Sequence, residues 1–501
     1  MSAPISSTSS TNKSGAATRS SPLGKFIESA PKIDPAVALA VRKAGPPRVK
    51  YFVPILRMIL FHLWFLPSSA ILIPLLIAKN ALPWLRTHRG WSFRLALGIE
   101  ATRWAMRNFI FFRLQPIAPR QGGLRERPGL LGALLQSLNA SGPGGRVVLP
   151  KQLAKTSLQA AKKQNRRRDR IWFDAPQLEY FRGILAIQPG KEGTGAVRTA
   201  GYRGPALVEP KWAKAKTRGF WFMRKDGEAP PEVDEKKSDR PVILYFHGGA
   251  GVTFGAGDIF MGMTLAQNLA RTSGIDVFSV DYNLAPFAPC PVPLSQAVGA
   301  WIHLQSLGYS PSQIFVGGDS YGGWLTLQLE RYLRFEMPAL HGEDHDQKPL
   351  GLILLSPQLA TVNEPFAARE RHLKYDIIVR AYPEWGIDAQ RIGPKHAKRA
   401  GPLADLTNTW VSPYTRSKEE FAELPPIFVA NGALECLVDE GIQFVAAARN
   451  AGVRNVEHDI AAHEPHDYFT MATSLPVAIR TYKRLGKWAH RIIDERGYEV
   501  A

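Results

Sequence analysis

The chain has 501 residues, 45% of them hydrophobic, so it can hold one large domain with additions and is too apolar to be mostly disordered. Its net charge of +20 comes from the first half of the chain. Residues 1–240 hold 41 Lys and Arg against 15 Asp and Glu, whereas residues 241–501 hold 22 against 28. Two cysteines exclude a disulfide scaffold and a cysteine-based metal site, and no zinc-finger, helix-turn-helix or RNA-binding signature accompanies the basic half, which argues against a nucleic-acid partner.

The N-terminal part predicts a polar arm followed by a membrane anchor. Residues 1–50 are rich in Ser and Thr, lack apolar periodicity and are expected to form a disordered arm. The segment Met58–Ala78 has 21 residues without Asp, Glu, Lys or Arg, enough to cross a hydrocarbon core of about 30 Å as a helix. We therefore expect residues 51–90 to be an anchor, either a single span or, because Pro67 and Pro74 interrupt it, a monotopic segment. A buried cap helix is the alternative.

The residues around the anchor bear on its orientation. Five basic residues precede the anchor and four follow it, which gives a slight preference for a cytosolic N-terminus. The stretch Trp91–Leu114 mixes aromatic residues with four arginines and suits a cationic helix on a membrane surface, with packing against the globular part as the alternative. Residues 91–240 as a whole are expected to be a basic cap and linker region with the first strands. They include a glycosylation triplet at Asn139.

A regular alternation begins at residue 241 and predicts the fold class. Continuous apolar runs alternate with helical patterns, and such runs are typical of a mostly parallel sheet that helices cover on both faces. Residues 241–501 are therefore expected to form an α/β domain, with its chemistry at the carboxyl ends of the strands. The expected strands are 242–246, 276–280, 313–316, 350–355, 426–430 and 456–460.

The octapeptide VGGDSYGG, Val316–Gly323, follows one of these strands and precedes a helical pattern that starts at Trp324. A serine between glycines in a strand-to-helix turn is typical of a nucleophile elbow, where the turn is strained and the hydroxyl projects outward. Gly318 and Gly322 lack side chains, so the strand and the helix can approach closely. Ser320 is therefore the candidate nucleophile, although the octapeptide alone would also fit a glycine-rich bend without chemistry.

A serine nucleophile needs a base, and the base needs a carboxylate to orient it. The candidate base is His466, with His463 as the alternative, in a loop between a short strand and the last helix. The segment after another strand offers three carboxylates as the candidate acid, those of Glu435, Asp439 and Glu440. The order Ser, acid, His along the chain is the order of the α/β-hydrolases.

An oxyanion intermediate also needs backbone donors. The loop His247–Ala250, sequence HGGA, follows a strand, and its glycines leave backbone N–H groups accessible. We expect the N–H groups of Gly248, Gly249 and Tyr321 to form the oxyanion hole. His247 is expected to hold the loop rather than to act as a ligand or a base.

Together these motifs resemble the hormone-sensitive lipase family of α/β-hydrolases, which includes the arylacetamide deacetylases. The resemblance covers residues 241–495, over which all the elements of the family pattern occur in order. An anchor ahead of such a domain is also similar to the fungal steryl acetyl hydrolases of the endoplasmic reticulum. The matching elements are His247–Ala250, Asp281–Pro286, Gly318–Gly323, Glu435 with Asp439 and Glu440, and His466.

The chain departs from this family pattern at three positions. Tyr321 replaces the usual alanine and is expected to alter access around the nucleophile. Asn283 replaces an arginine and is expected to affect packing only. The resemblance implies Glu435 as the acid, with Asp439 as the alternative. Glu435 replaces the usual aspartate, and α/β-hydrolases in general accept glutamate in this role. Asp319, beside the nucleophile, is expected to support the turn.

The resemblance implies a membrane-anchored serine esterase or lipase that needs no metal or organic cofactor. Ser320 would attack an ester carbonyl, His466 would move the proton, and Glu435 would orient the imidazolium. A cap built from the region before residue 241 and the insertion 364–424 would select an uncharged lipophilic ester, such as a short-acyl steryl ester, delivered from membrane lipids. The alternative is a catalytically inactive hydrolase fold that serves as a membrane-tethered binding or scaffold protein. The oligomeric state stays open.

Overall fold

The protein is described by a computed structural model. The predicted arm, residues 1–50, and the Asn139 triplet lie outside the described residues. The structure describes residues 54–113, 170–187, 208, 210–225, 228–231, 240–257, 259–285, 288, 290–341, 346–360, 366–379, 382–383, 386 and 409–496.

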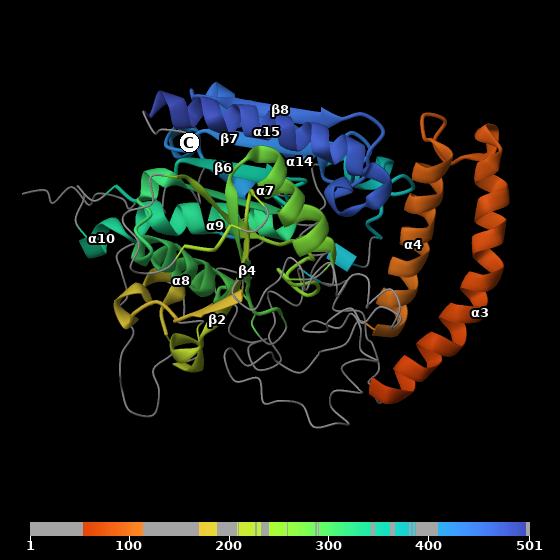
Figure 1. Cartoon of the computed structure of the whole chain (residues 1–501), viewed down its shortest axis with the longest axis horizontal. Coiled ribbons are helices and arrows are strands. Elements are labelled where there is room, and N and C mark those ends of the chain that lie inside the picture. The colour runs from red at the N-terminus through yellow and green to blue at the C-terminus, as the bar shows by residue number, and fades with distance from the viewer. Residues whose placement is uncertain are drawn as a thin grey trace, which may run out of the picture.

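An eight-stranded sheet in the order β1-β2-β4-β3-β5-β6-β7-β8 forms the centre of the molecule (Figure 1). Strand β2 pairs antiparallel with β1 and β4, and all the other neighbours pair parallel. Every residue of β3 to β7 is buried, which explains why these strands read as continuous apolar runs. The strands are β1 Arg170–Phe173, β2 Thr217–Phe222, β3 Val242–Phe246, β4 Asp276–Asp281, β5 Ile314–Asp319, β6 Gly351–Leu355, β7 Ile427–Gly432 and β8 Val456–Ala461.

Helices cover both faces of the sheet, which confirms the predicted α/β fold class. Helices α8, α9 and α14 share one hydrophobic core with the sheet, whereas α7 and α15 share the core on the other face. A π-helical segment, Ile259–Ala266, leads into α7. The helices of the domain are α7 Gln267–Ser273, α8 Val292–Ser306, α9 Tyr321–Phe335, α10 Pro338–His341, α11 Ala368–Arg371, α13 Lys418–Ala422, α14 Val438–Asn450 and α15 Leu475–Glu495.

Two long helices, α3 (Pro54–Ala81) and α4 (Phe93–Arg113), stand side by side at one end of the domain (Figure 1). Helix α3 runs through both of its prolines without a break. Among the described helices, α3 is the one long and apolar enough to cross a membrane, over Ile59–Ala81. The apolar segment predicted from the sequence is therefore a helix of the required length.

Helix α4 lies between α3 and the domain rather than apart from both. Arg103 donates to the backbone carbonyls of Leu373 and Asp376 in the insertion between β6 and β7. The structure thus shows the alternative given above for this stretch, packing against the globular part. The start of α4 and the residues before it form a small apolar cluster with the domain through Trp91, Leu95, Ala96, Ile99 and Met471.

Candidate active site

Ser320 occupies the turn between β5 and α9, in a backbone conformation that L-residues rarely adopt (φ 51°, ψ −116°). The turn closes so tightly that a Cβ on Gly318 or Gly322 would clash with the carbonyl oxygen of Phe246 on the neighbouring strand β3. Only glycine fits these two positions. The local sequence therefore places the Ser320 side chain at the carboxyl end of the sheet, where the elbow hypothesis expects it.

His466 approaches Ser320 from the loop after β8. Its Nε2 lies 3.0 Å from Ser320 Oγ, within hydrogen-bond distance, and both side chains are buried. His463, the alternative base, makes its contacts with Trp91 and His88. Its backbone carbonyl accepts a hydrogen bond from Trp91 Nε1 at 2.7 Å, and its ring lies against His88, with 5.1 Å between the ring centroids. Of the two histidines, His466 is the one in contact with the nucleophile.

Glu435 is the carboxylate on the other side of His466. Its Oε2 lies 3.8 Å from His466 Nδ1, an ion-pair distance longer than a hydrogen bond. The same oxygen accepts Ser356 Oγ at 2.6 Å and the N–H of Gly432 at 3.1 Å, and Oε1 accepts Asn431 Nδ2. These donors fix the carboxylate at the end of β7, so that it faces the imidazole.

Asp439, the alternative acid, lies in the first turn of α14 and binds residues of the insertion between β6 and β7. It accepts the N–H of Ala368 at 2.8 Å and forms an ion pair with Arg371 at 3.1 Å. No contact with His466 is among its interactions within the described residues. Its neighbour Glu440 is also structural, because it accepts the N–H groups of Leu359 and Ala360 at 2.7 and 2.8 Å. The geometry therefore favours Glu435 as the acid.

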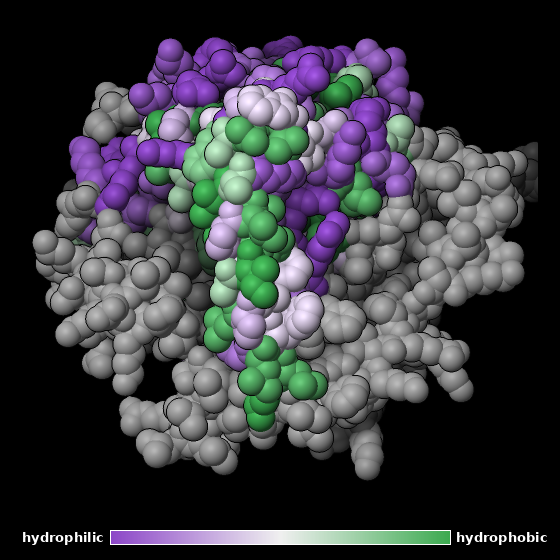
Figure 2. Space-filling view, turned by 90° about the vertical axis from the view of Figure 1, so that its right-hand side faces the viewer, coloured by the Kyte–Doolittle hydropathy of each residue, from purple (hydrophilic) through white to green (hydrophobic). Residues whose placement is uncertain are grey.

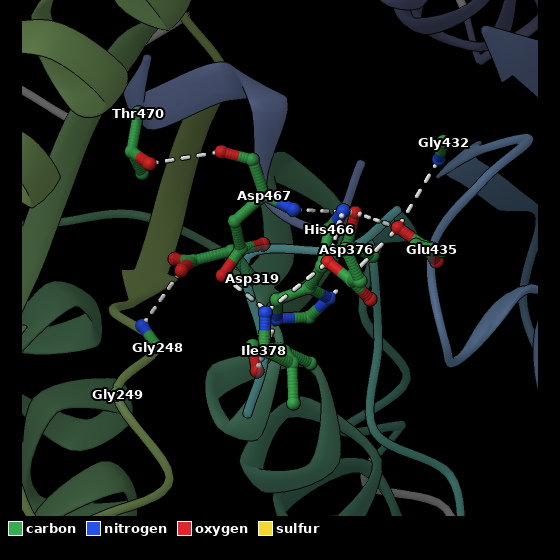
Figure 3. A network of polar contacts seen from close by, with 12 residues as sticks. Gly248, Gly249, Asp319, Asp376, Ile378, Gly432, Glu435, His466, Asp467 and Thr470 are labelled. Carbon is green, nitrogen blue, oxygen red and sulfur yellow. Dashed lines mark hydrogen bonds and ion pairs between the residues drawn. The ribbon is translucent and has the colours of Figure 1, made fainter. Parts of the chain in front are cut away.

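Asp376 is a site residue that the sequence reasoning missed. It is fully buried and accepts the backbone N–H of His466 at 3.0 Å with Oδ1 and that of Cys436 with Oδ2 (Figure 3). One carboxylate thus joins the loop after β7, which carries Glu435, to the loop after β8, which carries His466. Asp376 belongs to the insertion and has no motif around it, so no sequence signal could have found it.

Asp467 is a third carboxylate beside the base. Its Oδ2 lies 3.1 Å from His466 Nε2, the same nitrogen that faces Ser320 Oγ. Asp467 itself has a left-handed backbone conformation (φ 47°). Burial by itself lowers the pKa of His466, but the charges of Asp467, Glu435 and Asp376 outweigh burial and raise it. The resting site therefore favours an imidazolium more than an isolated histidine does.

Asp319 corrects one prediction about the oxyanion hole. It accepts the hydroxyl of Tyr245 at 2.8 Å and the N–H of Gly248 at 2.9 Å, and burial raises its pKa well above the usual range, helped by the charge of Asp467. Asp319 therefore supports the HGGA loop. Because the N–H of Gly248 already donates to the carboxylate of Asp319, it is not a free donor for an oxyanion.

Other backbone donors are close to the nucleophile, since Gly249 and Ala250 line the cavities that Ser320 lines and Tyr321 follows Ser320 in the chain. Among the described residues, the N–H groups of Gly249 and Ala250 have no hydrogen-bond acceptor, and that of Tyr321 starts helix α9 beside Ser320. Gly249 and Tyr321 remain candidates for the oxyanion hole, and Ala250 joins them as a candidate. His247 stacks on Tyr282 with ring centroids 4.3 Å apart, consistent with a structural role.

The side chain of Tyr321 points away from the nucleophile. It is buried in the core, with its ring centroid 4.9 Å from that of Trp324 and 6.0 Å from that of Tyr282. It lines neither of the two cavities that reach Ser320. The expectation that this residue alters access to Ser320 is therefore wrong.

Two cavities of unequal size meet at Ser320 and His466. The smaller has a volume of about 50 Å³ and is lined by Ala250, Gln358 and Cys436, among others. The larger has a volume of about 490 Å³, is mostly apolar, and extends from Ser320 to helices α3 and α4. Within the described residues, no group of three or more His, Cys, Asp or Glu side chains is arranged to hold a metal ion. The arrangement suits acyl transfer on an apolar molecule.

Comparisons with known proteins show which proteins this chain resembles. A family model described as alpha/beta hydrolase fold matches residues 243–470, which confirms the predicted α/β-hydrolase fold. Lipase 2 of Moraxella sp. (strain TA144) is 26% identical over 285 residues, 52% of this chain and 60% of that protein. Esterase LipI of Mycobacterium tuberculosis is 28% identical over 281 residues, 55% of this chain and 78% of that protein. A solved esterase of the bacterial hormone-sensitive lipase family is 28% identical with a TM-score of 0.43, covering 55% of this chain and 82% of its own.

Proposed function

We propose that this chain is a membrane-anchored serine esterase. The premise is that residues 243–470 are an α/β-hydrolase domain with the motifs of the hormone-sensitive lipases. The observation that carries the proposal is the 3.0 Å contact between Ser320 Oγ and His466 Nε2, with Glu435 on the far side of the imidazole. The relatives named as esterases and lipases support the same reaction class.

The residues at the site account for each step of ester hydrolysis. Ser320 Oγ attacks the carbonyl carbon while its proton passes to His466 Nε2, and the N–H groups of Gly249 and Tyr321 hold the oxyanion. The intermediate collapses to an acyl-enzyme, and His466 gives the proton to the departing alcohol. Water then attacks the acyl-enzyme with His466 again as the base, which releases the acid and restores Ser320. Glu435 holds the imidazole in place and stabilises its charged form.

The polarity of α3 supports the anchor. The side chains that face α4 include polar ones, since Ser69 accepts Trp104 Nε1 at 3.1 Å and Asn80 donates to Glu100 at 2.9 Å. The outward side is apolar, with Leu63 and Leu66 exposed to 67% and 61%. Figure 2 shows this face, where hydrophobic residues form a band along the helix. A helix with polar groups inside and apolar groups outside suits lipid rather than water.

The large apolar cavity supports a lipophilic substrate. A pocket of about 490 Å³ beside Ser320 offers room for the bulky part of an ester, and the pocket of about 50 Å³ offers room for a short one. We propose carboxylic esters of lipophilic alcohols as the substrate class, with steryl acetates as an example suggested by the family resemblance. A location in the endoplasmic reticulum with a cytosolic N-terminus is proposed on the same resemblance and on the basic residues around the anchor.

Labelling with a fluorophosphonate, which reacts with activated serines, tests the reaction class. Membranes containing the wild-type protein should be labelled and should hydrolyse p-nitrophenyl acetate, and the Ser320→Ala variant should do neither. If the wild-type protein is not labelled, the inactive-scaffold alternative replaces the esterase.

Alkaline carbonate extraction tests the anchor separately. The full chain should stay with the membrane pellet, because an inserted helix resists extraction that removes surface-bound proteins. Release into the supernatant would contradict the anchor and leave the esterase reaction untouched. Protease protection of sealed membranes then reports which side carries the N-terminus.

A further inference from the structure

The cavity beside the nucleophile is walled partly by the proposed anchor itself. Its lining begins at Ser320 and His466 and reaches Phe61 and Phe65 on α3. Helix α4 contributes further lining residues from its middle, Gly98, Thr102, Ala105 and Met106. A single continuous space therefore connects the catalytic serine with the helix pair.

The inner and outer sides of α3 are separated by only one helix width. Phe61 and Phe65 lie one turn apart on the inner side, are half-buried and stack with ring centroids 4.9 Å apart. Leu63 and Leu66, between and beside them in sequence, lie on the exposed side. Since an α-helix with its side chains is about 10 Å across, the cavity wall is about that thick where it faces the proposed bilayer.

We propose that the bulky apolar part of the substrate reaches Ser320 directly from the bilayer, by passing between α3 and α4 into this cavity. The proposal rests on the proposed function and adds to it the route and the occupant of the large cavity. The short part of the ester lies in the smaller cavity that also reaches Ser320. A long-chain ester dissolved in lipid loses apolar contacts whenever it passes through water, and this route keeps its chain in an apolar environment throughout.

The contacts between α3 and α4 limit where the substrate can pass. Polar bonds join the two helices at three levels, from Trp64 Nε1 to Asn108 Oδ1 at 2.8 Å, from Trp104 Nε1 to Ser69 Oγ at 3.1 Å and from Lys79 Nζ to Glu100 Oε1 at 2.6 Å. Gly98 is packed tightly, since a Cβ there would meet the side chain of Thr473 at 2.9 Å. The substrate would therefore enter between the three bonds, where Thr102 and Ala105 of α4 line the cavity.

A pair of acetate esters tests the proposal on the full-length protein in phosphatidylcholine vesicles. Hexadecyl acetate and p-nitrophenyl acetate give the same acetyl-enzyme, so a substitution that lowers kcat/KM for one ester and not for the other has changed how the alcohol part is bound or delivered. Ala105→Phe fills the cavity from α4, and Leu63→Phe, on the exposed side of α3, is the matched control. Rates are expressed per serine labelled by a fluorophosphonate, so that misfolded protein does not count.

We expect Ala105→Phe to lower kcat/KM for hexadecyl acetate at least tenfold and that for p-nitrophenyl acetate less than twofold, while Leu63→Phe changes neither. Equal loss on both esters, or loss on neither, would overturn the assignment of the cavity. If the wild-type protein hydrolyses neither ester, the proposed function fails instead.

The route is tested by where the ester is placed. Hexadecyl acetate in the same vesicles as the protein should be hydrolysed at least tenfold faster than the same amount in separate vesicles, and equal rates would overturn direct access from the bilayer. A second copy of the chain is the other occupant that the exposed face of α3 would suit. An intermolecular disulfide formed in high yield by a Leu63→Cys variant in vesicles would therefore also overturn the proposal.

Discussion

The carboxylate of Asp376 accepts the backbone N–H of His466 at 3.0 Å, and its second oxygen accepts the N–H of Cys436, the residue after Glu435. The base and its acid partner lie on separate loops, and this side chain from a third segment ties the two loops together (Figure 3). Within the described residues Asp376 binds backbone N–H groups of these loops rather than Ser320 Oγ or the imidazole, so we infer that it acts mainly by positioning them.

We expect Asp376→Asn to lower kcat for p-nitrophenyl acetate by about 10- to 100-fold with KM changed less than twofold, because misplacement by about 1 Å costs rates of this order. Asp276→Asn is the matched control, since Asp276 is also buried and accepts a backbone N–H, that of Arg224 at 2.7 Å, away from the site. Steady-state kinetics and thermal denaturation of both variants check this. Comparable losses of kcat in the two variants would show that Asp376 acts through stability alone.

The identity of the triad acid is open to a direct test. Glu435→Gln should lower kcat by about 10³- to 10⁴-fold, because the imidazole loses the charge that orients and stabilises it. Asp439→Asn should stay within about twofold of the wild type, because that carboxylate binds Ala368 and Arg371 instead. Ester hydrolysis by the two purified variants decides the matter, and the reverse order of effects would assign the role to Asp439.

The carboxylates around the base predict an alkaline pH profile. Burial lowers the pKa of His466, but Asp467 and Glu435 reverse this and raise it to about 10. A general base acts in its neutral form, so kcat/KM should increase with pH, with a midpoint well above the ordinary histidine value of 6.5.

Removal of the nearest charge should move that midpoint. Asp467→Asn removes the carboxylate 3.1 Å from His466 Nε2, so the imidazolium is less stable, the pKa falls, and the rate at pH 7 rises. The pH dependence of kcat/KM for p-nitrophenyl acetate measures both profiles. An unchanged midpoint in this variant would mean that Asp467 does not hold the proton on His466.

Two tyrosine-to-phenylalanine changes on α9 should differ in their effect on stability. The hydroxyl of Tyr321 is buried without a partner among the described residues, so Tyr321→Phe should be neutral or stabilising. The hydroxyl of Tyr332 donates to the backbone carbonyl of Tyr180, so Tyr332→Phe should cost about 1–3 kcal/mol. Thermal denaturation in detergent compares the two. A loss for Tyr321→Phe as large as that for Tyr332→Phe would contradict the burial of an unpaired hydroxyl at position 321.

The sheet and the nucleophile were predictable because their signals are local. Buried parallel strands require continuous apolar runs, and the tight turn at Ser320 requires glycine at fixed positions on either side. His466 and Glu435 were predictable because each follows directly on a strand and a known motif order exists. For residues placed in this way, the spacing along the chain already fixes the position in space.

The rest depended on contacts between distant segments, which a single sequence does not show. The N–H of Gly248 looked free in the HGGA motif, but the side chain of Asp319, 71 residues away, occupies it. The tyrosine at position 321 turned into the core because Tyr282 and Trp324 receive its ring. Asp376 became a site residue only through the folding of an insertion that has no motif.

The helix pair also bears on how the protein can be handled. A truncated protein that starts at the first strand would lose one wall of the active-site cavity, the hydrogen bond from Trp91 to the loop of His466, and the bonds by which Arg103 holds the Asp376 segment. The helix pair is therefore part of the wall and of the support of the catalytic centre. We expect truncation to open the cavity to water, so detergent or nanodisc preparations of the whole chain are the material on which selectivity can be measured.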